Sequence, residues 1–124
     1  MLKDNPLVSE VISSATEVHK ALGPELLESA YEACQCRELE LRNIPFRRQA
    51  SLTFEYKGAT IDCAYRMGIV VAELLLLELK SVDQVHPIRE APIISYLKLS
   101  KLKQGLLINF NTKLLKDGLK SFLN

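Results

Sequence analysis

Residues 74–80 read Leu-Leu-Leu-Leu-Glu-Leu-Lys and give the clearest indication of the fold. Side chains alternate along a strand, so its leucines cover both faces until the charged end. A strand that is apolar on both faces is typical of the centre of a sheet covered on both sides. The stretch therefore predicts an α/β fold in which helices flank a central mixed sheet.

Two helices are predicted before this strand, because apolar residues recur there at helical spacing. The first covers residues 7–22, with its stripe formed by Val8, Val11, Ile12, Ala15, Val18 and Leu22. The second covers residues 25–42 and is expected to bury Leu27, Ala30, Tyr31, Cys34 and Leu41. Gly23-Pro24 ends the first helix and can begin the second, since proline is tolerated in a first helical turn.

Between these helices and residue 74 the pattern changes to alternation, which predicts two further strands. One is Leu52–Tyr56, and a Lys57-Gly58 turn leads to the other, from Ala59 to about Val71.

After the central strand we expect a helix from Pro87 to about Lys101, with Ile94, Leu97 and Lys101 along one side. A buried strand, Gly105–Phe110, and a closing helix, Leu114–Leu123, would follow. The predicted order is α-α-β-β-β-α-β-α.

Composition predicts one ordinary globular domain, because 124 residues leave no room for two. The net charge of +1 gives no global attraction to nucleic acid or to anionic membranes, so any such binding needs a local basic patch. No stretch approaches the roughly 18 apolar residues of a membrane span. Three cysteines without framework spacing, and an N-terminus without a signal-like apolar run, predict a reducing cytoplasm.

Glu78 and Lys80 are the candidates for chemistry, since both project from one face at the end of the 74–80 strand. They can be read as a structural ion pair or as a strand end that reaches solvent. They can also be read as half of a metal-dependent phosphodiesterase site. In that interpretation Glu78 helps to hold Mg²⁺, which prefers oxygen ligands, and Lys80 contacts the scissile phosphate or the attacking water. A second carboxylate would then be expected on the preceding strand.

Five segments of the chain resemble the bacterial GxxExxY family of the PD-(D/E)XK nuclease superfamily, over residues 7–123. They are 22–31 (LGPELLESAY), 62–66 (DCAYR), 78–80 (ELK), 96–99 (YLKL) and 105–110 (GLLINF). The resemblance implies a restriction-endonuclease-like domain over residues 1–124 and nucleic-acid hydrolysis that depends on Mg²⁺ or Mn²⁺. It implies that Glu78 is the metal ligand, that Lys80 is catalytic, and that Glu28 and Tyr31 are accessory residues. Without it, Glu28 is a solvated helix carboxylate and Tyr31 a core aromatic residue.

Three positions depart from the pattern of that family. Gly68 stands where the metal-binding Asp is expected, Glu25 where the motif begins with glycine, and Pro92 where a glutamine is usual. Asp62 cannot replace the lost ligand, because six strand residues separate it from the site by about 20 Å. Glu73 belongs to the turn before the central strand. We therefore expect hydrolysis to be strongly impaired.

An alternative is a binding module that keeps the nuclease scaffold without a metal. Two basic groups could contact phosphates: Arg42, Arg47 and Arg48 after the second helix, and Lys98, Lys101 and Lys103 near the third. Either group can equally be a solubilising surface. A homodimer is a further hypothesis, with no residue that tests it directly. His19 and His86 have no motif partner and are read as ordinary residues.

Overall fold

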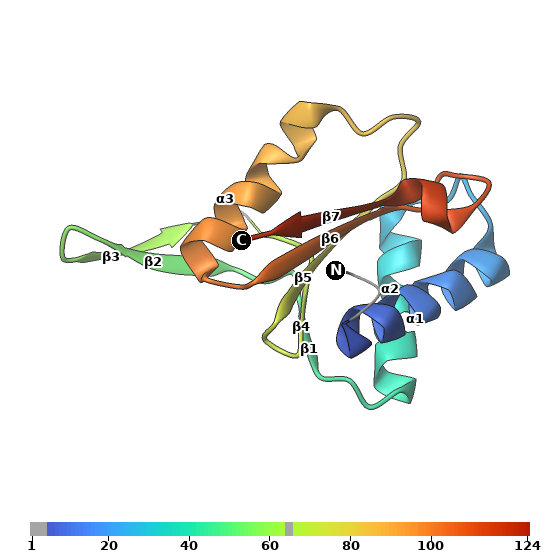
Figure 1. Ribbon diagram of the computed structural model, residues 1–124, viewed down its shortest axis with the longest axis horizontal. Coiled ribbons are helices and arrows are strands. Elements are labelled where there is room, and N and C mark those ends of the chain that lie inside the picture. Colours follow the sequence, from blue (N-terminus) through green and yellow to red (C-terminus); the bar gives the residue numbers. More distant parts are fainter. Residues whose placement is uncertain (1–4, 64–65) are drawn as a thin grey trace.

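A five-stranded sheet forms the centre of the structure, a computed structural model that describes residues 5–63 and 66–124 (Figure 1). Its strands lie in the order β1-β4-β5-β6-β7. Their bounds are Phe46–Arg48, Ile69–Val71, Leu75–Lys80, Gln104–Asn109 and Leu119–Leu123. β5 is central, antiparallel to β4 and parallel to β6, while the other described pairs are antiparallel. The predicted central strand is thus confirmed, and so is the mixed sheet flanked by helices.

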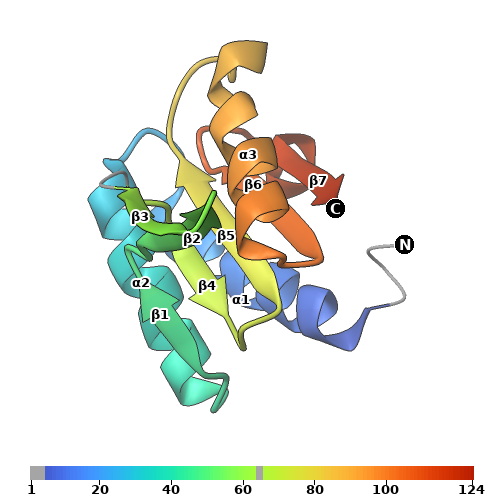
Figure 2. The ribbon, with the colours of Figure 1, turned by 90° about the vertical axis from the view of Figure 1, so that its left-hand side faces the viewer.

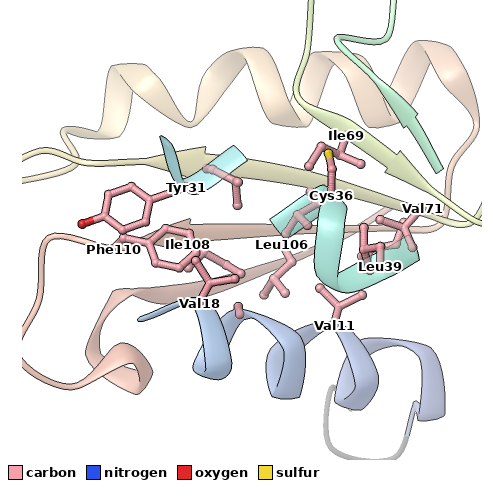
Figure 3. Close-up of a cluster of buried hydrophobic side chains, with 14 of the residues drawn as sticks. Val11, Val18, Tyr31, Cys36, Leu39, Ile69, Val71, Leu106, Ile108 and Phe110 are labelled. Carbon is pink, nitrogen blue, oxygen red and sulfur yellow. The ribbon is translucent and has the colours of Figure 1, made fainter. Parts of the chain in front are cut away.

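Helices cover both faces of this sheet (Figures 1 and 2). α1 (Pro6–Leu22) and α2 (Glu28–Leu41) pack on one face, where Tyr31, Leu39 and Phe110 are fully buried. Figure 3 shows this cluster between the two helices and the sheet. α3 (Ala91–Ser100) packs on the other face over Val70, Leu76 and Leu107. The two clusters share the central strands as their common wall.

α1 follows its predicted bounds closely, because both of its ends are capped. The side chain of Asn5 accepts hydrogen bonds from the backbone N–H groups of Leu7 and Val8, at 3.0 and 3.4 Å. Gly23, with φ of 70°, ends the helix in a conformation that favours glycine.

α2 begins at Glu28, three residues later than predicted. Glu25 has φ of 73°, which is incompatible with a right-handed helix, so the chain can enter the helix only after it. The buried face is also different from the prediction. Leu27 and Leu41 are 77% and 60% exposed, whereas the polar Gln35 is fully buried and donates to Ser14 Oγ at 2.6 Å. The Oε1 atom of Gln35 is buried without a hydrogen-bond partner among the described residues. An apolar pattern cannot predict that a polar residue is buried at such a position.

A β-hairpin of β2 (Leu52–Tyr56) and β3 (Ala59–Cys63) projects from the body of the molecule (Figure 1). Lys57 and Gly58 form its predicted two-residue turn, and both have positive φ, as a type I′ turn requires. The prediction of one strand from Ala59 to Val71 is wrong. Within the described part of the chain, β3 pairs with β2 alone, and β4 is a separate strand of the main sheet. The short edge strand β1 was not predicted, and Ala64 and Tyr65 of the quoted motif lie outside the described residues.

The C-terminal segment differs most from its prediction. Residues 114–123 do not form a helix: a 3-10 turn, Leu115–Gly118, leads into β7, which pairs antiparallel with β6. Without β7, the backbone groups along that edge of β6 would lack partners.

α3 begins at Ala91 rather than at Pro87, and a separate 3-10 turn covers Pro87–Arg89. Pro92 therefore lies in the first turn of α3, where proline is tolerated. Ile94 is 55% exposed, while Ile93, Tyr96 and Leu97 are buried. The helix is therefore rotated by about one residue from the predicted phase.

Candidate functional site at the end of β5

The candidate site lies where β5 extends beyond the end of its neighbour β4. Pairing between the two strands ends at Ile69 and Leu77, so the β4 side of β5 beyond Leu77 opens into a pocket of about 170 Å³. Glu28 and Glu32 from α2, Gly68 and Glu78 are among its lining residues. The structure thus brings Glu28 and Glu78 together at one pocket.

Glu78 and Lys80 form an ion pair at the predicted place. The Lys80 Nζ lies 4.0 Å from Glu78 Oε1, and the side chains are only 20% and 15% exposed. The other oxygen, Glu78 Oε2, accepts a hydrogen bond of 3.3 Å from the backbone N–H of Gly68. Each carboxylate oxygen of Glu78 therefore already faces a donor from the protein.

Burial raises the pKa of Glu78 above the ordinary value for a glutamate. The Lys80 ammonium and the Gly68 N–H act in the opposite direction, and the carboxylates of Glu28 and Glu32 add to the rise. The negative charge at this strand end is thus costly and depends on its two donors.

Gly68 cannot carry a side chain in this backbone. A Cβ atom placed there would overlap the carbonyl oxygen of Leu77, and it would also lie 3.4 Å from the Cα of Glu78. The chain at Gly68 packs directly against the backbone of β5. The position where a second carboxylate is expected is consequently filled by main chain, and an aspartate fits there only if the backbone moves.

Glu32 is a carboxylate of the pocket that sequence reasoning missed. It follows Glu28 by one helical turn, so both face the same side of α2. Arg48 lies 3.7 Å from Glu32 Oε2, and Gln49 Nε2 donates to the same oxygen at 3.4 Å. The i, i+4 spacing from Glu28 could have indicated this residue.

Tyr31 lies in the core rather than on the pocket wall. Its ring stacks on Phe110 with centroids 4.4 Å apart (Figure 3). Its hydroxyl donates to the Gly23 carbonyl at 2.5 Å and accepts from the Leu26 N–H at 3.1 Å. Tyr31 thus fixes the loop that leads into Glu28, and any influence on the pocket acts through that loop.

The two basic groups of the sequence have different surroundings. Arg47 forms a two-pronged pair with Glu73 at 2.7 and 3.1 Å, and Arg42 pairs with Glu38 and Glu10. With Arg48 held by Glu32, the arginine group is matched by carboxylates. Lys98, Lys101 and Lys103 are exposed, and within residues 5–63 and 66–124 none of them forms an ion pair.

The described residues do not assemble a ligand set for a metal ion. Among them, no group of three or more His, Cys, Asp or Glu side chains is placed to hold one. The cysteines are free, and burial raises the pKa of Cys36 to about 11, which disfavours the thiolate. None of the helices in the described part of the chain is long and apolar enough to cross a membrane.

A comparison with protein families gives a match over residues 5–122, nearly the whole chain, to the PD-(D/E)XK nuclease superfamily. The chain belongs to this superfamily. Comparisons with curated proteins and with solved structures gave no match.

PD-(D/E)XK nucleases typically depend on divalent metal ions, so membership of the superfamily implies such an ion. Two observations show that the residues of this pocket do not suit it: main chain fills the Gly68 position, and protein donors face both oxygens of Glu78. The chain thus has the scaffold of the superfamily, and its described residues do not bring three metal-ligating side chains together.

Proposed function

We propose that this PD-(D/E)XK protein is of the GxxExxY type and that its metal-dependent hydrolysis of nucleic-acid phosphodiesters is strongly impaired. The observation that carries the proposal is the backbone at Gly68, which packs on Leu77 and leaves no room for a ligand side chain. Glu78 would be the remaining metal ligand of the ancestral site, Lys80 its catalytic lysine and Glu28 an accessory acid. One or two carboxylates hold Mg²⁺ weakly without substrate phosphates.

The ion pair supports the same proposal. In an active site of this type the lysine would be free to contact phosphate or water, and the glutamate free to bind metal. Here Lys80 Nζ and Glu78 Oε1 face each other at 4.0 Å within a largely buried environment. A buried pair of this kind is a structural unit, because removing either partner leaves the other charge buried and unpaired.

Cleavage assays test the proposal directly. The unchanged chain, Glu78→Gln and Lys80→Ala are incubated with single- and double-stranded DNA and RNA in Mg²⁺ and in Mn²⁺. We expect the unchanged chain to cleave no faster than Glu78→Gln. Cleavage by the unchanged chain that both substitutions abolish would contradict impairment and show that another acid replaces the Asp.

Gly68→Asp is the informative addition to this assay. A simple loss of one ligand predicts that the new carboxylate restores activity. The overlap with Leu77 O instead predicts a loss of stability of about 1–3 kcal/mol, typical of overpacking, without restored cleavage. Gly68→Ala is the matched control, since it adds the Cβ without the carboxylate and should lose a similar amount.

A second candidate function is a nucleic-acid-binding module without catalysis. The observation that favours it is the group of exposed lysines around the end of α3, which lack ion-pair partners among the described residues. A homodimer remains a prediction, and light scattering tests it.

A further inference from the structure

Charge is distributed very unequally along this chain. Residues 1–90 carry ten Lys and Arg against fourteen Asp and Glu, a net charge of −4. Residues 91–124 carry six against one, a net charge of +5. The overall value of +1 therefore hides an acidic part, which supplies the Glu28, Glu32 and Glu78 carboxylates of the pocket, and a basic C-terminal part.

Three lysines of the basic part gather where α3 ends, and we call Lys98, Lys101 and Lys103 the lysine surface. All three are exposed, and residues 91–116 contain no acidic residue. Lys98 lies in the last turn of α3, and Lys101 is its C-cap residue in the left-handed conformation, so both belong to the end of the helix. Ammonium groups gathered at one place on the surface suit the phosphates of a nucleic-acid backbone.

The C-terminal residue fixes the backbone beneath this surface. The Asn124 side-chain amide donates to the carbonyls of Leu97 and Leu102, at 2.7 and 2.8 Å, and its backbone N–H donates to the Lys103 carbonyl at 2.9 Å. Figure 1 shows the end of β7 beside the last turn of α3. Because the turn that carries the lysines is held in place, binding would order only the side chains.

The lysine surface lies at the opposite end of the sheet from the pocket. Lys103 precedes Gln104, the first residue of β6, whereas Glu78 is in register with Leu107 of that strand. Three strand steps of about 3.3 Å separate Gln104 from Leu107 by roughly 10 Å. The lysine surface and the pocket at Glu78 are therefore separate regions of the sheet.

We propose that the lysine surface is a binding site for the phosphate backbone of nucleic acid, separate from the pocket at Glu78. The inference rests on the proposed nucleic-acid target of this PD-(D/E)XK protein. It specifies the place at which the nucleic acid is held, which is the basic end of α3, away from the carboxylates of the pocket. Binding there neither requires a metal nor leads to cleavage.

Fluorescence anisotropy with a labelled 20-base-pair DNA duplex and a labelled single-stranded RNA, in EDTA and over a range of salt concentrations, tests this inference. Each neutralised phosphate contributes a slope of about 0.9 in log K against log salt for duplex DNA. The Lys98→Gln/Lys101→Gln variant should lower the duplex slope by about 1.8 and weaken binding. Lys113→Gln/Lys116→Gln is the matched control, because it removes the same charge from the acid-free segment away from the end of α3, and it should leave the slope unchanged.

If the two double variants lose the same amount of affinity and salt slope, the lysine surface is not the binding site, and only a general effect of charge remains. Binding that depends on Lys80 but not on Lys98 and Lys101 would overturn the site in favour of the pocket. Lysine-dependent binding to vesicles of anionic phospholipid, without binding to either nucleic acid, would overturn the choice of partner. Because EDTA removes divalent ions, none of these results depends on whether the chain cleaves, so this inference and the proposed impairment fail separately.

Discussion

Glu25 occupies a backbone conformation that suits glycine, with φ of 73°. A non-glycine residue in the left-handed region costs roughly 1–2 kcal/mol, partly offset because glycine loses more freedom on folding. We therefore expect Glu25→Gly to raise the free energy of unfolding by about 0.5–1 kcal/mol, measured by urea denaturation. Glu25→Ala keeps the Cβ and should gain nothing. If alanine stabilises as much as glycine does, the gain comes from removing the charge rather than from the backbone.

At this scale the sequence predicted the residues whose position follows from strand alternation. Glu78 and Lys80 share a face because they are two apart on a strand, and the structure places them together. The tight packing of Gly68 against Leu77 could not be predicted, because it depends on how two strands approach each other in space. Glu32 was missed although its i, i+4 spacing from Glu28 could have indicated it; only its contacts with Arg48 and Gln49, which belong to another segment, required the structure.

At the scale of elements, the loop between α1 and α2 is held from two sides. Tyr31 bonds to Gly23 and Leu26, and the Ser81 hydroxyl donates to the Leu26 carbonyl at 2.5 Å. Tyr31→Phe keeps the stack on Phe110 but removes the hydroxyl, so we expect a loss of about 1–2 kcal/mol in the free energy of unfolding. Hydrogen exchange at the Leu26 amide should become faster.

The control for this change is Tyr56→Phe. Tyr56 is 58% exposed at the tip of the hairpin, so loss of its hydroxyl should alter stability by less than about 0.5 kcal/mol. A similar effect of both substitutions would contradict the role of Tyr31 in the loop.

Elements with a long, uniform pattern were predictable, whereas short and edge elements were not. α1, β2, β5 and β6 each show a clear helical or strand pattern, and they appear close to their predicted bounds. β1 is three residues long, which is too short for a pattern, and β7 is an edge strand whose apolar residues can equally line a helix. Pairing with β6 decides the conformation of β7, and such pairing is not visible in a local segment.

For the whole molecule, we propose that residues 1–124 form one domain. The clusters on the two faces both use β4, β5 and β6, so neither face can unfold alone without exposing the other. We expect a single cooperative transition in urea, with coincident curves from circular dichroism and from tyrosine fluorescence. Two separated transitions would show that α3 and the hairpin unfold independently of α1 and α2.

The stacking of Tyr31 on Phe110 also has a consequence for synthesis on the ribosome. Tyr31 emerges early, yet its aromatic partner follows 79 positions later, directly after β6. Until β6 is made, the apolar sides of α1 and α2 can cover only the earlier strands of the sheet, and β5 lacks its parallel neighbour. A chain that ends before Phe110 would expose this surface to chaperones and proteases. Quality control in the cell would therefore select against shortened chains, whether or not a ligand is present.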